Sequence, residues 1–338
     1  MAVSLAETLH GGPITLEEVD RVTEALIFAP GQPGGRFIKF SLLLLLASGI
    51  ATFGLLGDSL AVVIGAMIVA PLMLPIMGLA FSISLGDRRR IISTLLVSLA
   101  GIGMAVGVGF ALTLPVASLL VPQAIEQVMA RTQPHLFDLM AALATGVAGA
   151  FALARRDVSD TLPGVAIAVS LVPPLANVGI LLALGEPALA GGSLVLFLTN
   201  YVAILLTGSL VFMLMGFRQV ALAPFDPRAR RRALSLAVVA LLLLSIPLTL
   251  SSYRLIIRGS LASRTATLAR DWLRGTDYRL LSVKAETVDG AVEVLLAGNG
   301  ELPPIQRIEA QAQELLPGRS LHVQVLESRS YRIAGTAR

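Results

Sequence analysis

The stretch GAMIVAPLMLPIMG, residues Gly65–Gly78, decides how this chain folds. It is apolar enough to lie within a lipid bilayer, yet Pro71 and Pro75 stand in its middle. Proline lacks a backbone N–H and clashes with the preceding turn, which costs ~3 kcal/mol in a helix interior. Inside a membrane, no water is available to satisfy the backbone groups that such a break releases. The stretch therefore predicts a broken membrane helix that lines a wet cavity or is packed against protein.

The composition of the chain is typical of an integral membrane protein. Of its 338 residues, 55% are hydrophobic and 14% are charged, whereas soluble domains contain about 25% charged residues. There is no cysteine, the three histidines are far apart, and no nucleotide-binding glycine motif occurs. These absences give no basis for thiol chemistry, a metal centre, a cofactor or a nucleic-acid partner. We therefore expect a protein that is not an enzyme.

Long apolar runs predict seven membrane spans, because each is near the ~20 residues that a helix needs to cross a bilayer. Arginines are concentrated in every second connection between the expected spans. Arg131 is the one arginine in the remaining connections. The positive-inside rule then predicts a cytoplasmic N-terminus and an external C-terminus. The expected spans are about 37–56, 59–85, 91–114, 137–154, 162–184, 190–216 and 233–253.

Two polar segments flank the expected membrane domain, residues 36–256. Residues 1–35 form a cytoplasmic segment in which Thr15 and Glu18 predict a capping box and a short amphipathic helix. Residues 257–338 predict a small external α+β domain with the order helix, strand, strand, helix, strand, and an Asp-Gly turn between its first two strands. Through this order and VDGAVEVLLAG, the external part is similar to BON domains. A dimerising or capping domain without a ligand is the simpler interpretation.

A second apolar span, Gly164–Gly185, also carries prolines at its centre, Pro173 and Pro174. The two proline sites lie at matching distances from the starts of the first and fourth spans. Spans one to three and four to six therefore look like two copies of one unit, and because three is odd the second copy is inverted. Inverted repeats with interrupted helices are typical of transport sites near the midplane, where free backbone groups at the break can hold an ion or solute. Ordinary proline kinks are the alternative explanation.

The deep polar groups are amides and hydroxyls, since every acidic residue falls at a span end or in a loop. This pattern argues against a buried proton relay. Asn177 follows the second break, while Thr199 and Asn200 lie within another span. Each of these could instead join neighbouring helices by a hydrogen bond. The candidate pathway residues are Gly65, Pro71, Pro75, Gly78, Pro173, Pro174, Asn177, Thr199 and Asn200.

Two further motifs concern partners. Gly103 and Gly107 form a GxxxG pattern, which permits close helix packing within a protomer or in a homo-oligomer. The external domain is a second candidate for dimerisation. The segment RARRR ahead of the last span predicts an orientation anchor, with a possible role in binding anionic lipid. The expected partners are therefore membrane lipids and a second copy of the chain.

The stretch GDSLAVVIGAMIVAPLMLPIMGLAFSISLGD resembles the bacterial family of uncharacterised hydrophobic domains called domain of unknown function 389. The resemblance continues through RTQPHLFDLMAALATGVAGAFAL, LPGVAIAVSLVPPLANVGILLALG and LVLFLTNYVAIL, over about residues 37–216. It implies a polytopic protein of the bacterial inner membrane and no established substrate. Where the family often has a small apolar residue after PPLA, this chain has Asn177. Residues in the family's blocks are Asp58, Gly65, Pro71, Pro75, Gly78, Arg131, Pro134, Asp138, Pro173, Pro174, Asn177 and Asn200.

Two functions compete at this point. The first is a channel or transporter for a small ion or polar solute, with its pathway at the breaks around Pro71/Pro75 and Pro173/Pro174. The second is a non-transporting envelope scaffold or sensor that acts through the external C-terminal domain. A membrane enzyme is disfavoured, because the acids nearest the surfaces, Asp58, Asp157 and Asp160, have no histidine or cysteine beside them in the sequence.

Overall fold

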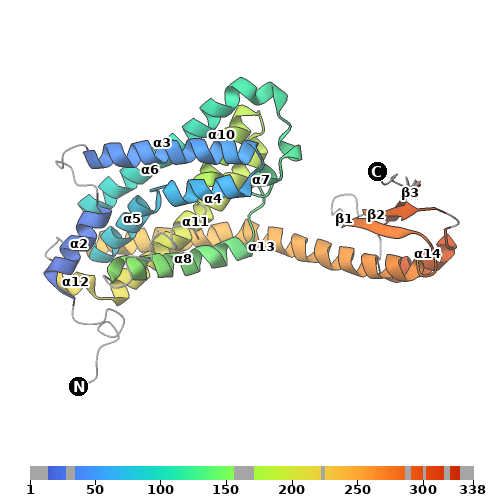
Figure 1. Cartoon of the computed structure of the whole chain (residues 1–338). Helices are drawn as coiled ribbons and strands as arrows, with labels where there is room; N and C mark the ends of the chain where they lie inside the picture. Colours follow the sequence, from blue (N-terminus) through green and yellow to red (C-terminus); the bar gives the residue numbers. More distant parts are fainter. Residues whose placement is uncertain are drawn as a thin grey trace, which may run out of the picture. The chain divides into compact units, whose positions relative to one another are not determined.

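The structure is a computed structural model that describes residues 14–27, 35–155, 171–221, 225–285, 291–299, 302–315 and 320–327. It divides into two compact units, Met1–Thr249 and Leu250–Arg338. The first unit is helical, and Figure 1 labels its elements. They are α2 (Leu16–Leu26), α3 (Gly35–Leu56), α4 (Leu60–Val69), α5 (Met73–Leu85), α6 (Arg88–Thr113), the 3-10 turns η1 (Leu114–Leu119) and η2 (Pro122–Ala124), α7 (Glu126–Met129), α8 (Leu136–Ala154), α10 (Val172–Ala183), α11 (Pro187–Leu214), α12 (Phe217–Val220) and the first part of α13 (Pro227–Trp272).

Five of the described helices are long and apolar enough to cross a membrane: α3, α6, α8, α11 and the Pro227–Leu250 part of α13. The bent pair α4–α5 makes a sixth candidate, and α10 is a shorter apolar helix. These helices are compatible with a membrane protein. The first part of the predicted span 162–184 lies outside the described residues, so the count of seven spans stays a prediction.

The predicted break at Pro71 is present in the structure. Helix α4 ends at Val69 and α5 begins at Met73, and the two axes are bent by 48°. Ala70 is extended, with φ −70° and ψ 121°, as expected for a residue that precedes proline. Pro75 lies in the first turn of α5, where a missing N–H costs nothing. Its position means that Pro75 helps to start α5 and does not kink it.

Helices α6 and α10 cross at very short range through two glycines. A Cβ added to Gly109 would lie 2.3 Å from the carbonyl oxygen of Ala176, and one added to Gly179 would lie 2.2 Å from that of Val106. Gly103 and Gly107, in contrast, would meet no described atom within 4 Å. Close packing inside the protomer therefore uses Gly109 and Gly179, while a contact between protomers through the GxxxG pattern stays a prediction.

Helix α2 covers one end of the first unit. The predicted capping box of Thr15 and Glu18 is present, and the apolar face of the helix, Val22 and Leu26, is fully buried. A Cβ on Gly78 of α5 would lie 2.6 Å from the carbonyl oxygen of Leu26. The Arg21 guanidinium donates to the carbonyl oxygen of Ala154 at 2.9 Å, where the C-terminal end of α8 attracts positive charge.

The two ends of the first unit differ in chemistry. Figure 1 shows α2 and α12 at one end and α7 at the other. The α2 end also carries the turn between α5 and α6 and the start of α13, because the backbone N–H of Asp226 donates to the carbonyl oxygen of Gly86 at 2.9 Å. We call this the arginine end, since residues 88–90 and 228–232 lie there. The α7 end contains Asp58, Arg131 and the start of α11.

The second unit contains a three-stranded sheet with the order β1-β2-β3. Strand β1 (Arg279–Ala285) is antiparallel to β2 (Ala291–Gly298), and β3 (Ser320–Glu327) is parallel to β2 after α14 (Ile305–Leu315). The last turns of α13 pack on this sheet through Trp272, whose indole N–H donates to the carbonyl oxygen of Pro304 at 3.2 Å. The predicted Asp-Gly turn, residues 289–290, lies outside the described residues.

The glycine crossing gives a test of the fold. We expect Gly179→Ala to lower the free energy of unfolding by about 1–3 kcal/mol, because the added methyl group would overlap backbone atoms of α6. Gly103→Ala is the matched control in a neighbouring helix, and we expect no loss there because the space beside Gly103 is open. Thermal unfolding in detergent micelles measures both. Equal midpoints for the two variants would contradict the close crossing.

Candidate functional site

Two helices of the first unit, α5 and α10, begin inside the packed core. Their N-cap residues, Leu72 and Leu171, make no side-chain capping hydrogen bond. A helix start normally leaves four N–H groups without partners. In α10, Pro173 and Pro174 remove two of these donors. In α5, Pro75 removes one, and the N–H of Leu74 donates to the carbonyl oxygen of Pro71 at 3.1 Å.

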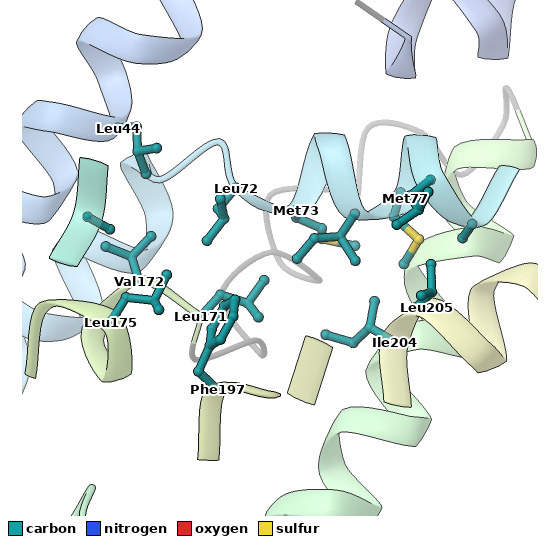
Figure 2. Close-up of a cluster of buried hydrophobic side chains, with 14 of the residues drawn as sticks. Leu44, Leu72, Met73, Met77, Leu171, Val172, Leu175, Phe197, Ile204 and Leu205 are labelled. Atoms are coloured by element: carbon teal, nitrogen blue, oxygen red, sulfur yellow. The ribbon is translucent and has the colours of Figure 1, made fainter. Parts of the chain in front are cut away.

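These helix starts therefore offer fewer free amides than the broken-span pattern predicts from sequence. Their surroundings are also apolar. Figure 2 shows Leu72 and Met73 of one break near Leu171 and Val172 of the other, with Phe197 of α11 beside them. All five belong to one buried cluster, and none is more than 9% exposed. We call these five residues the apolar layer. At the breaks themselves, the described residues provide hydrophobic packing and not a polar site.

The polar site lies closer to the α7 end and is centred on Asn177 of α10. This side chain is fully buried. Its Nδ2 donates to the carbonyl oxygen of Val128 at 3.0 Å and to Ser193 Oγ at 2.7 Å. Ser193 of α11 in turn donates to the carbonyl oxygen of Arg131 at 3.0 Å. One amide therefore joins α10 to α7 and α11, and Ser193 extends the connection to the segment after α7.

The network continues to the turn between α3 and α4. Asp58 has a positive φ of 51°, a conformation that Asp adopts more readily than most residues. Its Oδ1 accepts a hydrogen bond from the backbone N–H of Gln127 at 2.7 Å. The Arg131 guanidinium donates to the Gln127 side-chain oxygen at 3.1 Å and to the Gln127 carbonyl oxygen. Burial lowers the pKa of the Arg131 guanidinium from its usual value.

Two buried atoms of this network have no partner among the described residues: the Oδ1 of Asn177 and the Nε of Arg131. Buried polar atoms in folded proteins are nearly always hydrogen-bonded. A buried water or a small solute is the kind of molecule that supplies such missing bonds. The Oδ1 atom can accept a donor, and the Nε–H can donate to an acceptor.

The structure brings together only part of the predicted pathway set. Asn177 joins residues of the α7 end, and Pro173 and Pro174 precede it in the same helix. Gly78 lies instead against Leu26 at the arginine end, and a Cβ on Gly65 would meet no described atom within 4 Å. Thr199 donates to the carbonyl oxygen of Val195 in its own helix at 2.7 Å. Asn200 is buried in α11, as predicted for a deep amide.

Sequence reasoning did not identify Ser193, Gln127 or Gly192 as parts of the site. A Cβ on Gly192 would lie 2.0 Å from the carbonyl oxygen of Thr132, so α11 and the segment after α7 touch backbone to backbone. The Gly-Gly-Ser sequence at the start of α11 was the available signal, because small residues permit such an approach. Nothing local in the sequence pairs these residues with Asn177.

Comparison with known proteins agrees with the resemblance found in the sequence. Residues 67–206 match the family described as domain of unknown function (DUF389). This part of the chain is similar to a DUF389 domain. This domain runs from the end of α4 into α11, so it contains both proline sites, the Arg131 segment, Asn177 and Ser193. Asp58 and Gly65 precede the matched residues.

The chain is also similar to the uncharacterized protein MJ0678 of Methanocaldococcus jannaschii. The two are 29% identical over 177 residues, which make up 52% of this chain and 53% of the relative. The chain thus spans about half the length of the curated relative it matches. The name of that relative assigns no activity. The expected bacterial membrane and the BON-like C-terminal part remain predictions.

The network predicts an energetic role for Ser193. We expect Ser193→Ala to lower the free energy of unfolding by about 1–3 kcal/mol, because the Arg131 carbonyl loses its donor and Asn177 Nδ2 loses an acceptor. The matched control is Ser235→Ala, since Ser235 is exposed and bonds only the Arg231 carbonyl of its own helix among the described residues. Thermal unfolding in detergent measures both. Equal effects of the two substitutions would mean that the buried network adds no stability.

Proposed function

We propose that this chain is a membrane channel or transporter for a small ion or polar solute, with its pathway beside the starts of α5 and α10. The observation that carries the proposal is the pair of helices that begin inside the core without capping side chains. Non-helical backbone at membrane depth is tolerated only where protein or a water-filled cavity surrounds it. Paired discontinuous helices are a typical device of transporters.

The proposal includes seven spans and two inverted repeats. In it, α3, α4–α5 and α6 form the first repeat, and α8, a span ending in α10, and α11 form the second. It also places the arginine end in the cytoplasm and the second unit outside, because segments 88–90 and 228–232 lie at one end while Arg131 is at the other. Three features support this arrangement: the 48° bend in the first repeat, the proline start of α10, and the separation of charge.

In this proposal the polar network around Asn177 binds the solute, and the apolar layer restricts its passage. Asn177 and Arg131 each have a buried atom without a described partner, and these atoms provide hydrogen bonds for a polar solute that enters from the α7 end. The apolar layer beyond them acts as a hydrophobic constriction, which excludes water until its side chains separate. No catalytic chemistry is assigned to this arrangement.

The second candidate is an envelope scaffold or sensor that acts through the second unit. One observation favours it: this unit has its own hydrophobic core, formed by Leu268, Trp272, Val294, Leu296 and Ile308 among others. A domain with its own core can bind a partner without any transport by the membrane part. In this alternative, dimerisation through the second unit is the function of that domain.

Flux through liposomes tests the proposal. We expect selective leakage of small ions or solutes from liposomes that contain wild-type protein. Asn177→Leu should reduce this leakage by roughly tenfold, the effect of losing about one hydrogen bond in the pathway. Val172→Ala should increase it, because a smaller side chain widens the apolar layer. Leu210→Ala is the control, since Leu210 is 50% exposed on the outside of α11.

The truncated chain 1–259 separates the two candidate functions. It lacks the core of the second unit but retains all the helices of the proposed pathway. A channel or transporter should still conduct after this truncation. Folded wild-type protein that shows no flux under any gradient would contradict the transport proposal and favour the scaffold.

A further inference from the structure

Two arginine-rich segments that are far apart in the sequence are held together at the arginine end. Besides the backbone hydrogen bond from Asp226 to Gly86, the ring of Phe225 lies against Gly86. A Cβ on Gly86 would be 2.6 Å from that ring, and Gly86 has a positive φ of 69°. Any residue with a Cβ would be strained at this positive φ and would overlap the Phe225 ring, so only glycine fits here. The contact holds the start of α6 close to the start of α13, and the charges of Arg88 and Arg228 both act on Asp226.

Phe225 carries two guanidinium groups on its ring. Arg218 of α12 lies 4.5 Å from the ring centroid, and Arg230 of α13 lies 5.0 Å from it. Both distances are within the range of cation–π attraction, which holds each guanidinium in a defined place. Phe225 as a whole is still 40% exposed. An aromatic ring thus gathers two cations and remains accessible at the surface.

The acidic residue at the centre of this group is already engaged. The Asp226 carboxylate caps α13 by accepting from the backbone N–H groups of Arg228 at 2.9 Å and Ala229 at 3.1 Å. The Ala229 hydrogen bond, with the Arg228 hydrogen bond and the charges of Arg88 and Arg228, lowers the pKa of the Asp226 carboxyl. Asp87 likewise caps α6 and pairs with Arg90 at 3.2 Å. The described segment therefore has more arginines than carboxylates.

The place of this group along the helices identifies its partner. Three candidate membrane helices have their ends here: α6 begins at Arg88, α11 ends at Leu214 and α13 begins at Pro227. The ends of membrane helices lie at the level of lipid headgroups. A guanidinium binds phosphate with two parallel hydrogen bonds, and an exposed aromatic ring is favoured at this interface.

We propose that Arg88, Arg218, Arg228 and Arg230 around Phe225 form a binding site for the headgroup of an anionic phospholipid. The guanidinium groups bind the lipid phosphate, and the exposed edge of Phe225 contacts the apolar part of the lipid below it. The site is distinct from the Asn177 network, which lies at the other end of the first unit. It requires that the long apolar helices lie in a membrane, and it is independent of transport.

Lipid binding to the full chain tests the site. Purified protein in neutral detergent is titrated with phosphatidylglycerol or phosphatidylcholine, and bound lipid is counted by native mass spectrometry. We expect saturable binding of phosphatidylglycerol and a rise in the unfolding temperature that phosphatidylcholine does not produce. The double variant Arg218→Gln/Arg230→Gln should weaken this binding by roughly thirtyfold, because ~1 kcal/mol per arginine near a charged lipid adds to ~2 kcal/mol for the pair.

Two other variants show whether position or total charge decides the result. Arg279→Gln/Arg307→Gln removes the same charge from exposed residues of the second unit, and it should leave phosphatidylglycerol binding unchanged. Asp226→Asn keeps a capping oxygen and removes the central negative charge, so it should tighten binding. Each variant is first shown to unfold at the wild-type temperature in lipid-free detergent. Where the Gln pair fails this check, Arg218→Lys/Arg230→Lys replaces it; this pair keeps the charge but loses the two-point guanidinium contact with phosphate, so it should still weaken phosphatidylglycerol binding, by less than the Gln pair.

Two results would overturn the proposal. Equal weakening by the two double variants would show unspecific attraction to total charge. Complete displacement of the lipid by millimolar inorganic phosphate or glycerol phosphate would show a site for a free anion, with no contribution from the apolar part of the lipid. Neither result depends on whether the protein conducts.

Discussion

The rest of the first unit depends on one constraint: a helix that begins inside an apolar core must dispose of its first N–H groups. In water these groups would be solvated, and at most helix starts a Ser, Thr or Asp side chain accepts one of them. Here α4 and α6 begin at the surface and have such caps, Ser59 and Asp87. In α5 and α10, prolines occupy the first turns, and because proline has no backbone N–H, fewer N–H groups there need a partner. The breaks are therefore compatible with a dry, apolar environment.

This solution separates two properties that transport proteins often combine at one place. The breaks provide the change in backbone direction, and the hydrogen-bonding groups lie one turn or more away, at Asn177. A single amide there joins α10 to α7 and α11, and Asp58 extends the connection from α7 to the turn between α3 and α4. The polar network therefore holds the outer parts of both broken regions in one arrangement, while the apolar layer fills the space between the helix starts.

Much of this architecture follows from local sequence. Hydropathy predicts α3, α6, α8 and α11 to within a few residues, and Pro71 predicts the bend, because both signals act through neighbouring residues. The site is less predictable, because Asp58 meets a residue 69 positions away, Gln127, and no local pattern encodes that contact. The glycine motifs show the same limit: GxxxG identifies Gly103 and Gly107, whereas the contact inside the protomer uses Gly109 and Gly179. A motif states that close approach is possible, and only tertiary structure selects the face.

Helix α5 connects these features along one rigid element. It starts at the apolar layer, touches the Leu26 carbonyl through Gly78, and ends at Leu85, just before Gly86, which contacts Asp226 and Phe225. A continuous helix transmits a displacement from one end to the other, because its backbone hydrogen bonds resist bending. The Pro71 break, the α2 cover and the arginine group around Phe225 are therefore joined by one helix. In the proposed membrane setting, a lipid bound at Phe225 would favour one position of α5 to the extent that it binds that position more tightly. Such a differential affinity would be the physical link between the proposed lipid site and the broken helix.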